Sequence, residues 1–179
     1  MTIKGTKEQE EIWNEMKNGN GHMMVYACAG TGKTFTIVEG AKYVEGKKGF
    51  LAFNKSIATE LGKKLPLDCE AMTFHSLGLA SIKMSNRSAK VDTKKNYNII
   101  KDVLGKEFKS APALNKLISL LKSSMADWED EEQIHSIINQ YDIEFDGLSD
   151  ERAAIAALPL IRKICMDITL VDFDDMIWL

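Results

Sequence analysis

The chain has 179 residues, enough to bury a hydrophobic core, and suggests one domain or one domain with a sizeable insertion. Its hydrophobic content of 45% and charged content of 27% are typical of a globular protein, and no apolar run approaches the roughly 20 residues needed to cross a bilayer. The N-terminus has no apolar signal core, and the three cysteines have no metal-like spacing. We therefore expect a cytoplasmic protein with buried free thiols and no membrane partner.

Charge is unevenly distributed along the chain, although the net charge is only -3. Residues 83–122 contain ten Lys or Arg and three acids, whereas residues 123–151 contain ten acids and no Lys or Arg. The first block can form a polyanion-binding face beside a repelling one. Alternatively, the two blocks are solvated helical surfaces that attract each other. Charge alone does not decide between these interpretations.

The most informative stretch is residues 25–34, Val-Tyr-Ala-Cys-Ala-Gly-Thr-Gly-Lys-Thr. An apolar run at residues 23–27 predicts a strand, and a helix is expected from Lys33. A strand, a glycine-containing loop and a helix in this order are typical of sites for a nucleoside triphosphate, because loop N–H groups and the helix N-terminus face the phosphates. In this pattern Lys33 reaches the β- and γ-phosphates and the Thr34 hydroxyl contacts Mg²⁺. The alternative is a tight turn with a solvated lysine.

The candidate nucleotide-binding residues of this loop are Ala27, Cys28, Ala29, Gly30, Thr31, Gly32, Lys33 and Thr34, of which Lys33 and Thr34 are also the candidate catalytic residues. Ala27 stands where the full phosphate-loop pattern has a glycine. Alanine still permits close approach of the backbone to a phosphate, so the departure is mild.

The first half of the chain alternates between predicted helices and short strands. A helix is expected from Thr6, which with Gln9 fits a capping box. Strands are expected at residues 49–53 and 70–74, each followed by a helix, the first beginning at Asn54 and the second at His75. Alternation of this kind predicts an α/β fold with a parallel sheet. Together with the phosphate loop it is the pattern of a P-loop NTPase, here with an incomplete sheet of three strands.

The second half shows four helical patterns with no strand between them, at residues 92–104, 114–125, 134–141 and 155–168. Asp92 is the expected N-cap of the first helix. Pro159 lies inside the last pattern, so we expect a kink or a helix boundary near Leu158. We interpret residues 85–168 as an inserted all-helical subdomain, and residues 1–84 with 169–179 as the ATP-binding domain.

Four stretches, in this order, resemble the N-terminal half of superfamily-1 helicases of the UvrD/PcrA/Rep type, and the related F-box and phage UvrD-like DNA helicases. Residues 6–12 are similar to the Q motif, and residues 27–34 to the phosphate loop, where this family also commonly has alanine first. Residues 51–58 resemble the motif after the second strand, and residues 73–78 the T-F-H-S motif after the third. A helical insertion at this point, domain 1B, is also a feature of the family.

The resemblance implies ATP and Mg²⁺ as cofactors, and single-stranded DNA and single/double-strand junctions as partners. It implies that Gln9 holds the adenine edge, since a carboxamide has both a donor and an acceptor. It implies that Phe53 stacks on a DNA base, whereas the alternative for Phe53 is core packing. The residues implied to contact the DNA backbone, or to couple it to the ATP site, are Asn54, Lys55, Thr73 and His75. Because domain 1B lies against DNA in the family, the resemblance also favours the polyanion-binding interpretation of the basic block.

The C-terminal segment allows two interpretations. Apolar residues followed by Asp172 can form a Walker B strand, in which Asp172 binds Mg²⁺ through water and Asp174 or Asp175 positions the attacking water. By resemblance, however, the D-F-D-D sequence at residues 172–175 is the segment that returns the chain from domain 1B, and the true Walker B strand follows downstream. We favour the return segment, with Asp174 and Asp175 at a helix N-terminus where the dipole suits them.

The resemblance therefore implies an ATP-dependent DNA helicase, an ATP hydrolase. We expect this chain to be an incomplete N-terminal portion from which the remaining helicase domains are absent, so that ATP binding is weak and hydrolysis is negligible. One alternative is a non-motor P-loop NTPase or kinase with Asp172 as the Walker B residue and the helical insertion as a lid. Another is a DNA-binding accessory protein without catalysis.

Overall fold

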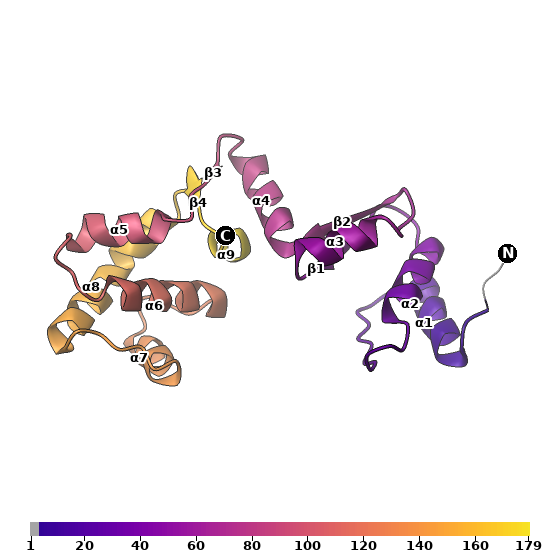
Figure 1. Cartoon of the computed structure of the whole chain (residues 1–179), viewed down its shortest axis with the longest axis horizontal. Helices are drawn as coiled ribbons and strands as arrows, with labels where there is room; N and C mark the ends of the chain where they lie inside the picture. The colour runs from indigo at the N-terminus through magenta and orange to yellow at the C-terminus, as the bar shows by residue number, and fades with distance from the viewer. Residues whose placement is uncertain (1–3) are drawn as a thin grey trace. The chain divides into compact units, whose positions relative to one another are not determined.

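The computed structural model describes residues 4–179, and Figure 1 shows the order of the elements. The chain divides into two compact units, Met1–Phe74 and His75–Leu179. Each unit is a mixture of helices with one small parallel sheet, so the predicted α/β class is confirmed at this level. The predicted domain division, with residues 169–179 rejoining residues 1–84, stays a prediction. Within residues 4–179, no helix has both the length and the apolar character that spanning a bilayer requires.

The first unit opens with helix α1 (Lys7–Asn18), which packs on α2 (Lys33–Gly40). The predicted capping box is confirmed, because the Thr6 hydroxyl accepts from Gln9 N at 3.3 Å and Gln9 Oε1 accepts from Thr6 N at 2.9 Å. Trp13 is the buried residue of α1, and its Nε1 donates to the Thr36 carbonyl at 2.8 Å. A 3₁₀ turn, η1 (Ala41–Tyr43), ends the helical segment.

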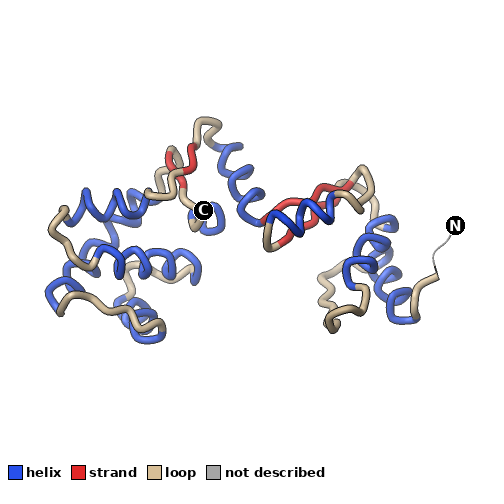
Figure 2. The backbone as a smooth tube through the Cα atoms, in the orientation of Figure 1, coloured by secondary structure: helices blue, strands red, loops and turns tan. Residues whose placement is uncertain are grey.

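Strands β1 (Lys48–Ala52) and β2 (Cys69–Thr73) form a parallel pair, with Lys48 opposite Cys69 and Ala52 opposite Thr73. Helix α3 (Lys55–Gly62) connects them in sequence and packs on both strands. Figure 2 shows this strand pair and the two-residue pair of the second unit in red. The two parallel strands and the helix between them are as the sequence predicted.

The predicted strand at residues 23–27 is wrong, since this segment is irregular. Met24 is 76% and Tyr26 is 89% exposed. A strand is defined by the hydrogen bonds to its neighbour, and an apolar run supplies hydrophobic side chains but no partner. Within residues 4–74 the sheet therefore has two strands, not the three that the sequence predicted.

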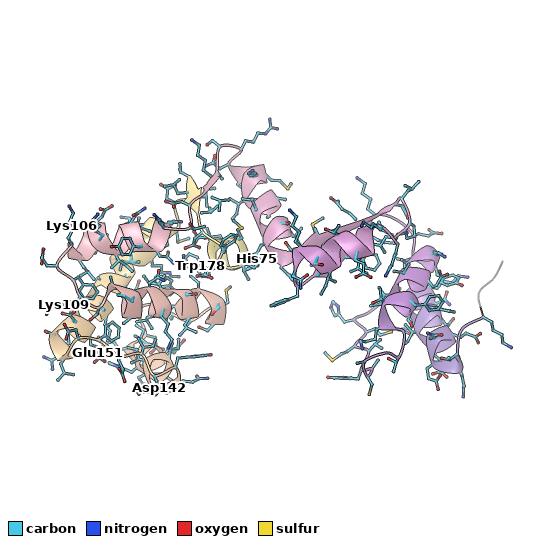
Figure 3. The ribbon with its side chains drawn as sticks, viewed as in Figure 1. His75, Lys106, Lys109, Asp142, Glu151 and Trp178 are labelled. Atoms are coloured by element: carbon cyan, nitrogen blue, oxygen red, sulfur yellow. The ribbon has the colours of Figure 1, made fainter. Side chains whose placement is uncertain are left out.

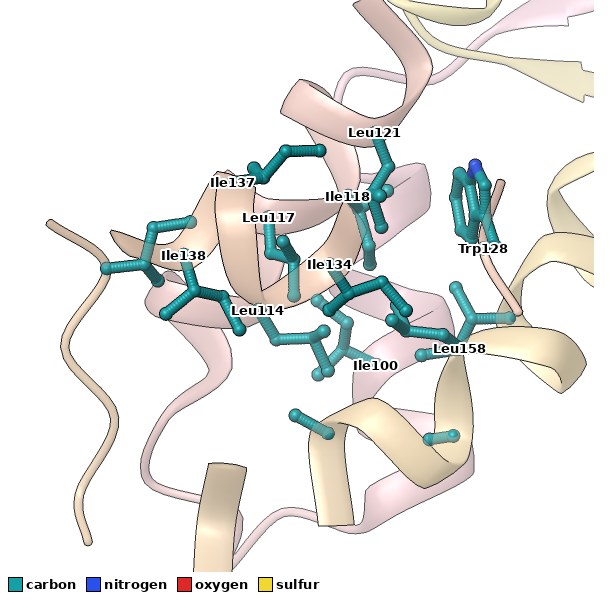
Figure 4. Close-up of a cluster of buried hydrophobic side chains, with 14 of the residues drawn as sticks. Ile100, Leu114, Leu117, Ile118, Leu121, Trp128, Ile134, Ile137, Ile138 and Leu158 are labelled. Atoms are coloured by element: carbon teal, nitrogen blue, oxygen red, sulfur yellow. The ribbon is translucent and has the colours of Figure 1, made fainter. Parts of the chain in front are cut away.

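The second unit is mainly helical. Its helices are α4 (Phe74–Ser85), α5 (Lys95–Leu104), α6 (Ala111–Ser124), α7 (Glu131–Gln140), α8 (Leu148–Cys165) and the short α9 (Asp175–Trp178). Its core lies between α5, α6, α7 and α8, as Figure 4 shows. Helix α6 contributes Leu114, Leu117, Ile118 and Leu121, all 0% exposed. Their spacing places them on one face of a helix, so the predicted apolar stripe is the core face.

Strands β3 (Lys90–Val91) and β4 (Leu170–Val171) pair in parallel, with Val91 opposite Val171. The segment predicted to be wholly helical therefore contains one short strand. Two-residue strands of this kind carry too short a pattern to be recognised before the pairing is known.

Two predicted helix boundaries are also corrected. Helix α5 begins at Lys95 with Lys94 as the N-cap residue, whereas Asp92 accepts a hydrogen bond from Lys94 N at 2.9 Å and so shapes the turn before the helix. Helix α8 continues through Pro159 for 18 residues, which excludes the helix boundary that was one of the two outcomes expected near Leu158. Leu158 and Ile161 are both 0% exposed, and their burial offsets the hydrogen bond that proline cannot donate.

Four charged side chains are buried together in the second unit, and we call them the charge cluster: Lys95, Lys122, Asp172 and Asp175. Lys95 Nζ lies 2.7 Å from Asp175 Oδ2, and Lys122 Nζ lies 2.8 Å from Asp175 Oδ1 and 3.0 Å from Asp172 Oδ2. Lys95 also donates to the carbonyls of Cys165 and Asp167 at 2.7 and 3.1 Å. Two of the ten cations in the predicted basic block are therefore internal.

The surroundings of Lys122 in the charge cluster favour its charged state. Burial by itself lowers the pKa of Lys122, but the hydrogen bond with Asp175 and the surrounding negative charge outweigh this effect and raise the pKa. Burial also raises the pKa of the neighbouring Cys165 thiol to about 11, so this cysteine is protonated and inert.

Helices α4 and α9 approach each other closely at Gly78. A Cβ added there would lie 1.6 Å from the carbonyl oxygen of Met176, so no larger residue fits without moving the backbone. Met176 also belongs to a small core with Ile82, Ala89 and Val171. The charge cluster and this contact together fix residues 170–178 to the rest of the second unit.

We expect Lys122→Met to lower the free energy of unfolding by about 3–5 kcal/mol, because it leaves the buried Asp175 and Asp172 carboxylates without one of their cations. Urea denaturation followed by circular dichroism measures the change. The matched control is Lys109→Met, which removes an exposed lysine 3.4 Å from Asp146 and should cost about 0–1 kcal/mol. Equal losses in the two variants would show that the charge cluster adds nothing beyond a surface pair.

Candidate functional site

The loop at residues 27–34 is shaped by two glycines. Gly30 and Gly32 have φ angles of 82° and 81°, a left-handed conformation that residues with a Cβ rarely adopt. Gly32 is also the N-cap residue of α2, so the loop leads directly into the helix. Residues 21–31 are exposed throughout. The loop thus brings the positive N-terminal end of α2 to an open surface.

Lys33, the first residue of α2, folds back over this loop. Its Nζ donates to the carbonyls of Ala27 at 3.1 Å and Cys28 at 2.7 Å, and the Thr31 hydroxyl donates to the same Cys28 carbonyl at 2.8 Å. No carboxylate in residues 4–179 forms an ion pair with Lys33. No carboxylate therefore neutralises the lysine charge and no side chain caps α2, so both can attract an anion.

Thr36 connects the Gln9 side chain to the loop at Gly32. Gln9 Nε2 donates to Thr36 Oγ1 at 3.0 Å, and Thr36 Oγ1 donates to the Gly32 carbonyl at 3.0 Å. Because Gln9 Oε1 is already used in the capping box, one hydrogen of its NH₂ group remains for another acceptor. Thr36 was not predicted from the sequence. The only sequence signal is a threonine on the buried face of a helix.

A cavity of about 770 Å³ joins these features within the first unit. Its walls combine the loop, Gln9 and Lys33 with the apolar side chains of Ile12, Met16 and Val25. This size and this mixture of an apolar wall with a few polar groups are typical of small-molecule sites.

Thr34 is the predicted metal ligand, and it lies exposed at the second position of α2. No group of three or more His, Cys, Asp or Glu in the described part of the chain is arranged to hold a metal ion. Mg²⁺ at a phosphate site takes most of its ligands from phosphate oxygens and water and only one or two from the protein. Thr34 fits such a site, in which the cation arrives with the phosphates.

Phe53 and its neighbours lie at the carboxyl end of β1. The Phe53 side chain is 89% exposed, so it takes no part in the core. Asn54 is the N-cap of α3, its Oδ1 accepting from Ile57 N at 2.9 Å, and Lys55 is exposed at the first position of that helix. Thr73 ends the neighbouring strand opposite Ala52. Ligands of α/β sheets bind at this edge.

His75 belongs to the second unit, at the start of α4 (Figure 3). Its ring packs edge-to-face against Phe173, with ring centroids 5.7 Å apart and an interplanar angle of 83°. Both side chains are exposed, Phe173 by 53%. Sequence reasoning missed Phe173, because nothing in a single sequence reports that residues 75 and 173 are in contact.

The carboxylates of the C-terminal segment are used within the second unit. Asp172 Oδ1 accepts from Asp175 N at 2.7 Å, and Asp175 Oδ2 accepts from Asp172 N at 3.0 Å, in addition to their lysine partners in the charge cluster. Asp174 is the N-cap residue of α9, as the preferred interpretation of this segment predicted. The strand before Asp172 pairs with β3, not with β1 or β2. The contacts of Asp172 and Asp175 thus hold this segment within the second unit.

The family described as UvrD/REP helicase N-terminal domain matches residues 7–179, almost the whole chain. The chain belongs to this family. It is also similar to F-box DNA helicase 1 of Gallus gallus, with 35% identity over 81 residues. That match covers 45% of this chain and 8% of the relative, so the chain spans only a small part of the longer protein. No solved structure matches the chain.

Proposed function

We propose that this UvrD/REP-family chain is the ATP-binding and single-stranded-DNA-contacting portion of an ATP-dependent DNA helicase, with a P-loop NTPase (RecA-like) fold. The observation that carries the proposal is the free charge of Lys33 in a glycine-shaped loop at the start of α2. Family membership makes a nucleoside triphosphate the natural anion for this loop. No observation on this chain favours a kinase, since the Asp172 carboxylate needed for that alternative is buried with Lys122.

At the nucleotide, each residue has a separate task. The N–H groups of residues 30–34 and the Lys33 ammonium would hold the phosphates, and the Thr34 hydroxyl would ligate Mg²⁺. The remaining Gln9 N–H would donate to a ring nitrogen of adenine while its other atoms keep the capping box and Thr36 in place. Bound Mg²⁺ supplies charge neutralisation at the phosphates.

At the DNA, the exposed Phe53 ring would stack on a base, a contact that does not depend on sequence. Asn54, Lys55 and Thr73 stand beside it at the same sheet edge and would contact sugar and phosphate. In the second unit the exposed His75–Phe173 pair would offer a further aromatic surface. Eight of the ten cations at residues 83–122 are exposed and would attract single strands and junctions.

Cys28 provides a direct test of the nucleotide site. It is exposed in the loop, whereas Cys69 is half-buried and Cys165 is buried. The expectation of buried thiols is therefore wrong for Cys28, which lies in a loop outside the core. We expect Mg·ATP to protect Cys28 from alkylation by iodoacetamide without changing the rate at Cys69, as measured by mass spectrometry of the peptides. Lys33→Ala should abolish the protection, because the phosphates lose their only lysine partner in the loop.

The matched control for this experiment is Lys42→Ala, which removes a lysine paired with Glu39 outside the loop. This variant should keep the protection of Cys28. If ATP protects Cys28 equally in Lys33→Ala, or protects it in no variant, the loop is not the nucleotide site.

For the DNA site, we expect Phe53→Ala to weaken binding of a labelled single-stranded oligonucleotide by about 1–3 kcal/mol, the value of one base–aromatic stack. Fluorescence anisotropy at several salt concentrations measures it, and affinity should fall as salt rises. The control is Leu67→Ala, another exposed apolar residue of the first unit, at 108% relative exposure. Absence of DNA binding would favour the kinase alternative. Equal effects of the two substitutions would show that Phe53 is not part of the DNA interface.

A further inference from the structure

A groove of about 650 Å³ lies in the second unit between α7, α8 and the turn before α7. It contains none of the residues assigned to ATP or DNA. Its apolar lining consists of Trp128, Ile134, Leu148, Ile155, Ala156 and Pro159. Leu148 is 70% exposed, so the groove presents apolar surface to the outside.

Charged side chains surround this apolar lining. The ionisable groups that line the groove are Glu129, Glu131, His135, Glu151 and Arg152. His135 Nδ1 lies 3.6 Å from Glu151 Oε1. Neither Glu129 nor Glu131 forms an ion pair with any residue in the described part of the chain. The groove therefore has three carboxylates against one arginine and one histidine, and two of the three carboxylates have no ion-pair partner among residues 4–179.

Other acids of the same segment have hydrogen-bond roles in the fold. Asp130 caps α7 by accepting from Glu132 N and Gln133 N, and Asp150 accepts from the Ser110 hydroxyl at 2.8 Å. Glu131 and Glu151 lie in the first turns of α7 and α8, where the helix dipole stabilises negative charge. Two helix N-termini thus allow several carboxylates to share one groove despite their repulsion. Figure 3 shows Glu151 on α8.

The groove wall also contains a side-chain N–H without a partner. Trp128 is 1% exposed, and its Nε1 has no hydrogen-bond partner among residues 4–179. Pro159 has no N–H, so the Ile155 carbonyl lacks the hydrogen bond that the residue four positions later would donate in a regular helix. An apolar surface within a rim of charged groups is the usual composition of a protein–protein interface.

We propose that the groove between α7 and α8 docks a basic, amphipathic segment of a partner protein. Lys or Arg side chains of that segment would pair with Glu129, Glu131 and Glu151, while its apolar side chains would cover Leu148 and Ile155. The charge decides the class of partner. Residues 123–151 hold ten acids and no Lys or Arg, so a nucleic acid is repelled from this face, whereas a cationic peptide is attracted.

A synthetic helical peptide of leucine and lysine, labelled with fluorescein, is a suitable probe for the purified 179-residue chain. We expect saturable binding in fluorescence anisotropy. The double substitution Glu129→Lys with Glu131→Lys should weaken it by about tenfold or more, because both uncompensated carboxylates are reversed. The control, Glu132→Lys with Glu144→Lys, makes the same charge change at two exposed acids outside the groove and should stay within about twofold.

Two further measurements separate docking in the groove from general attraction. Leu148→Ser leaves the charge unchanged and should also weaken peptide binding, and a peptide with serine in place of leucine should bind poorly. In the unsubstituted chain, addition of the peptide should shift the NMR methyl signals of Ile134 and Ile155.

Equal weakening by the groove and control charge reversals would overturn the proposal, as would absence of peptide binding or of methyl shifts. Displacement of the peptide by single-stranded DNA with the same methyl shifts would assign the groove to nucleic acid instead. Loss of ATP or DNA binding elsewhere in the chain has no bearing on this result, since the groove shares no residue with those sites.

Discussion

Two lysines and two aspartates, buried together in the second unit, hold the C-terminal segment of the chain against the helices. Removing four charges from water is costly, and the structure offsets that cost by giving Asp175 two ammonium partners and Lys95 two additional carbonyl acceptors. The same contacts hold β4 and α9 against the helical core. Because Asp172 and Asp175 are buried in these ion pairs, the D-F-D-D segment has a structural role. Within it, Phe173 is exposed and Asp174 is half-buried.

The first unit is arranged differently, with a small core and open loops. Thr36 connects α2 to α1 by two hydrogen bonds. Its hydroxyl accepts from the Gln9 side chain and its carbonyl accepts from the Trp13 side chain. These bonds fix α2, and hence Lys33 at its start, relative to α1. The groups proposed to bind ligands remain outside the core, including Lys33, Thr34 and Phe53. The first unit thus fixes α2 against α1 and leaves the loop at residues 27–31 exposed.

Local patterns were sufficient for the elements that local physics decides. The capping box at Thr6, the parallel pair β1–β2 with its connecting helix and the leucine stripe of α6 all follow from short-range rules of capping and periodicity. Features that depend on distant partners were not predictable. The strand predicted at residues 23–27 does not form, because no neighbouring strand pairs with it. Val91 pairs with Val171, eighty residues away, and the sequence alone does not show that Lys122 is buried beside Asp175. The same limit concealed Thr36 and Phe173, whose roles exist only as contacts.

Hydrogen exchange measured with and without Mg·ATP tests the central claim most directly, since it reports on the loop and on the D-F-D-D segment in one experiment. If the loop binds the nucleotide and the C-terminal aspartates are structural, amides of residues 28–36 will exchange more slowly with Mg·ATP, and those of residues 170–178 will not change. Slower exchange at residues 170–178 with none at residues 28–36 would contradict the account, because the Asp172 carboxylate would then be the group that responds to the nucleotide.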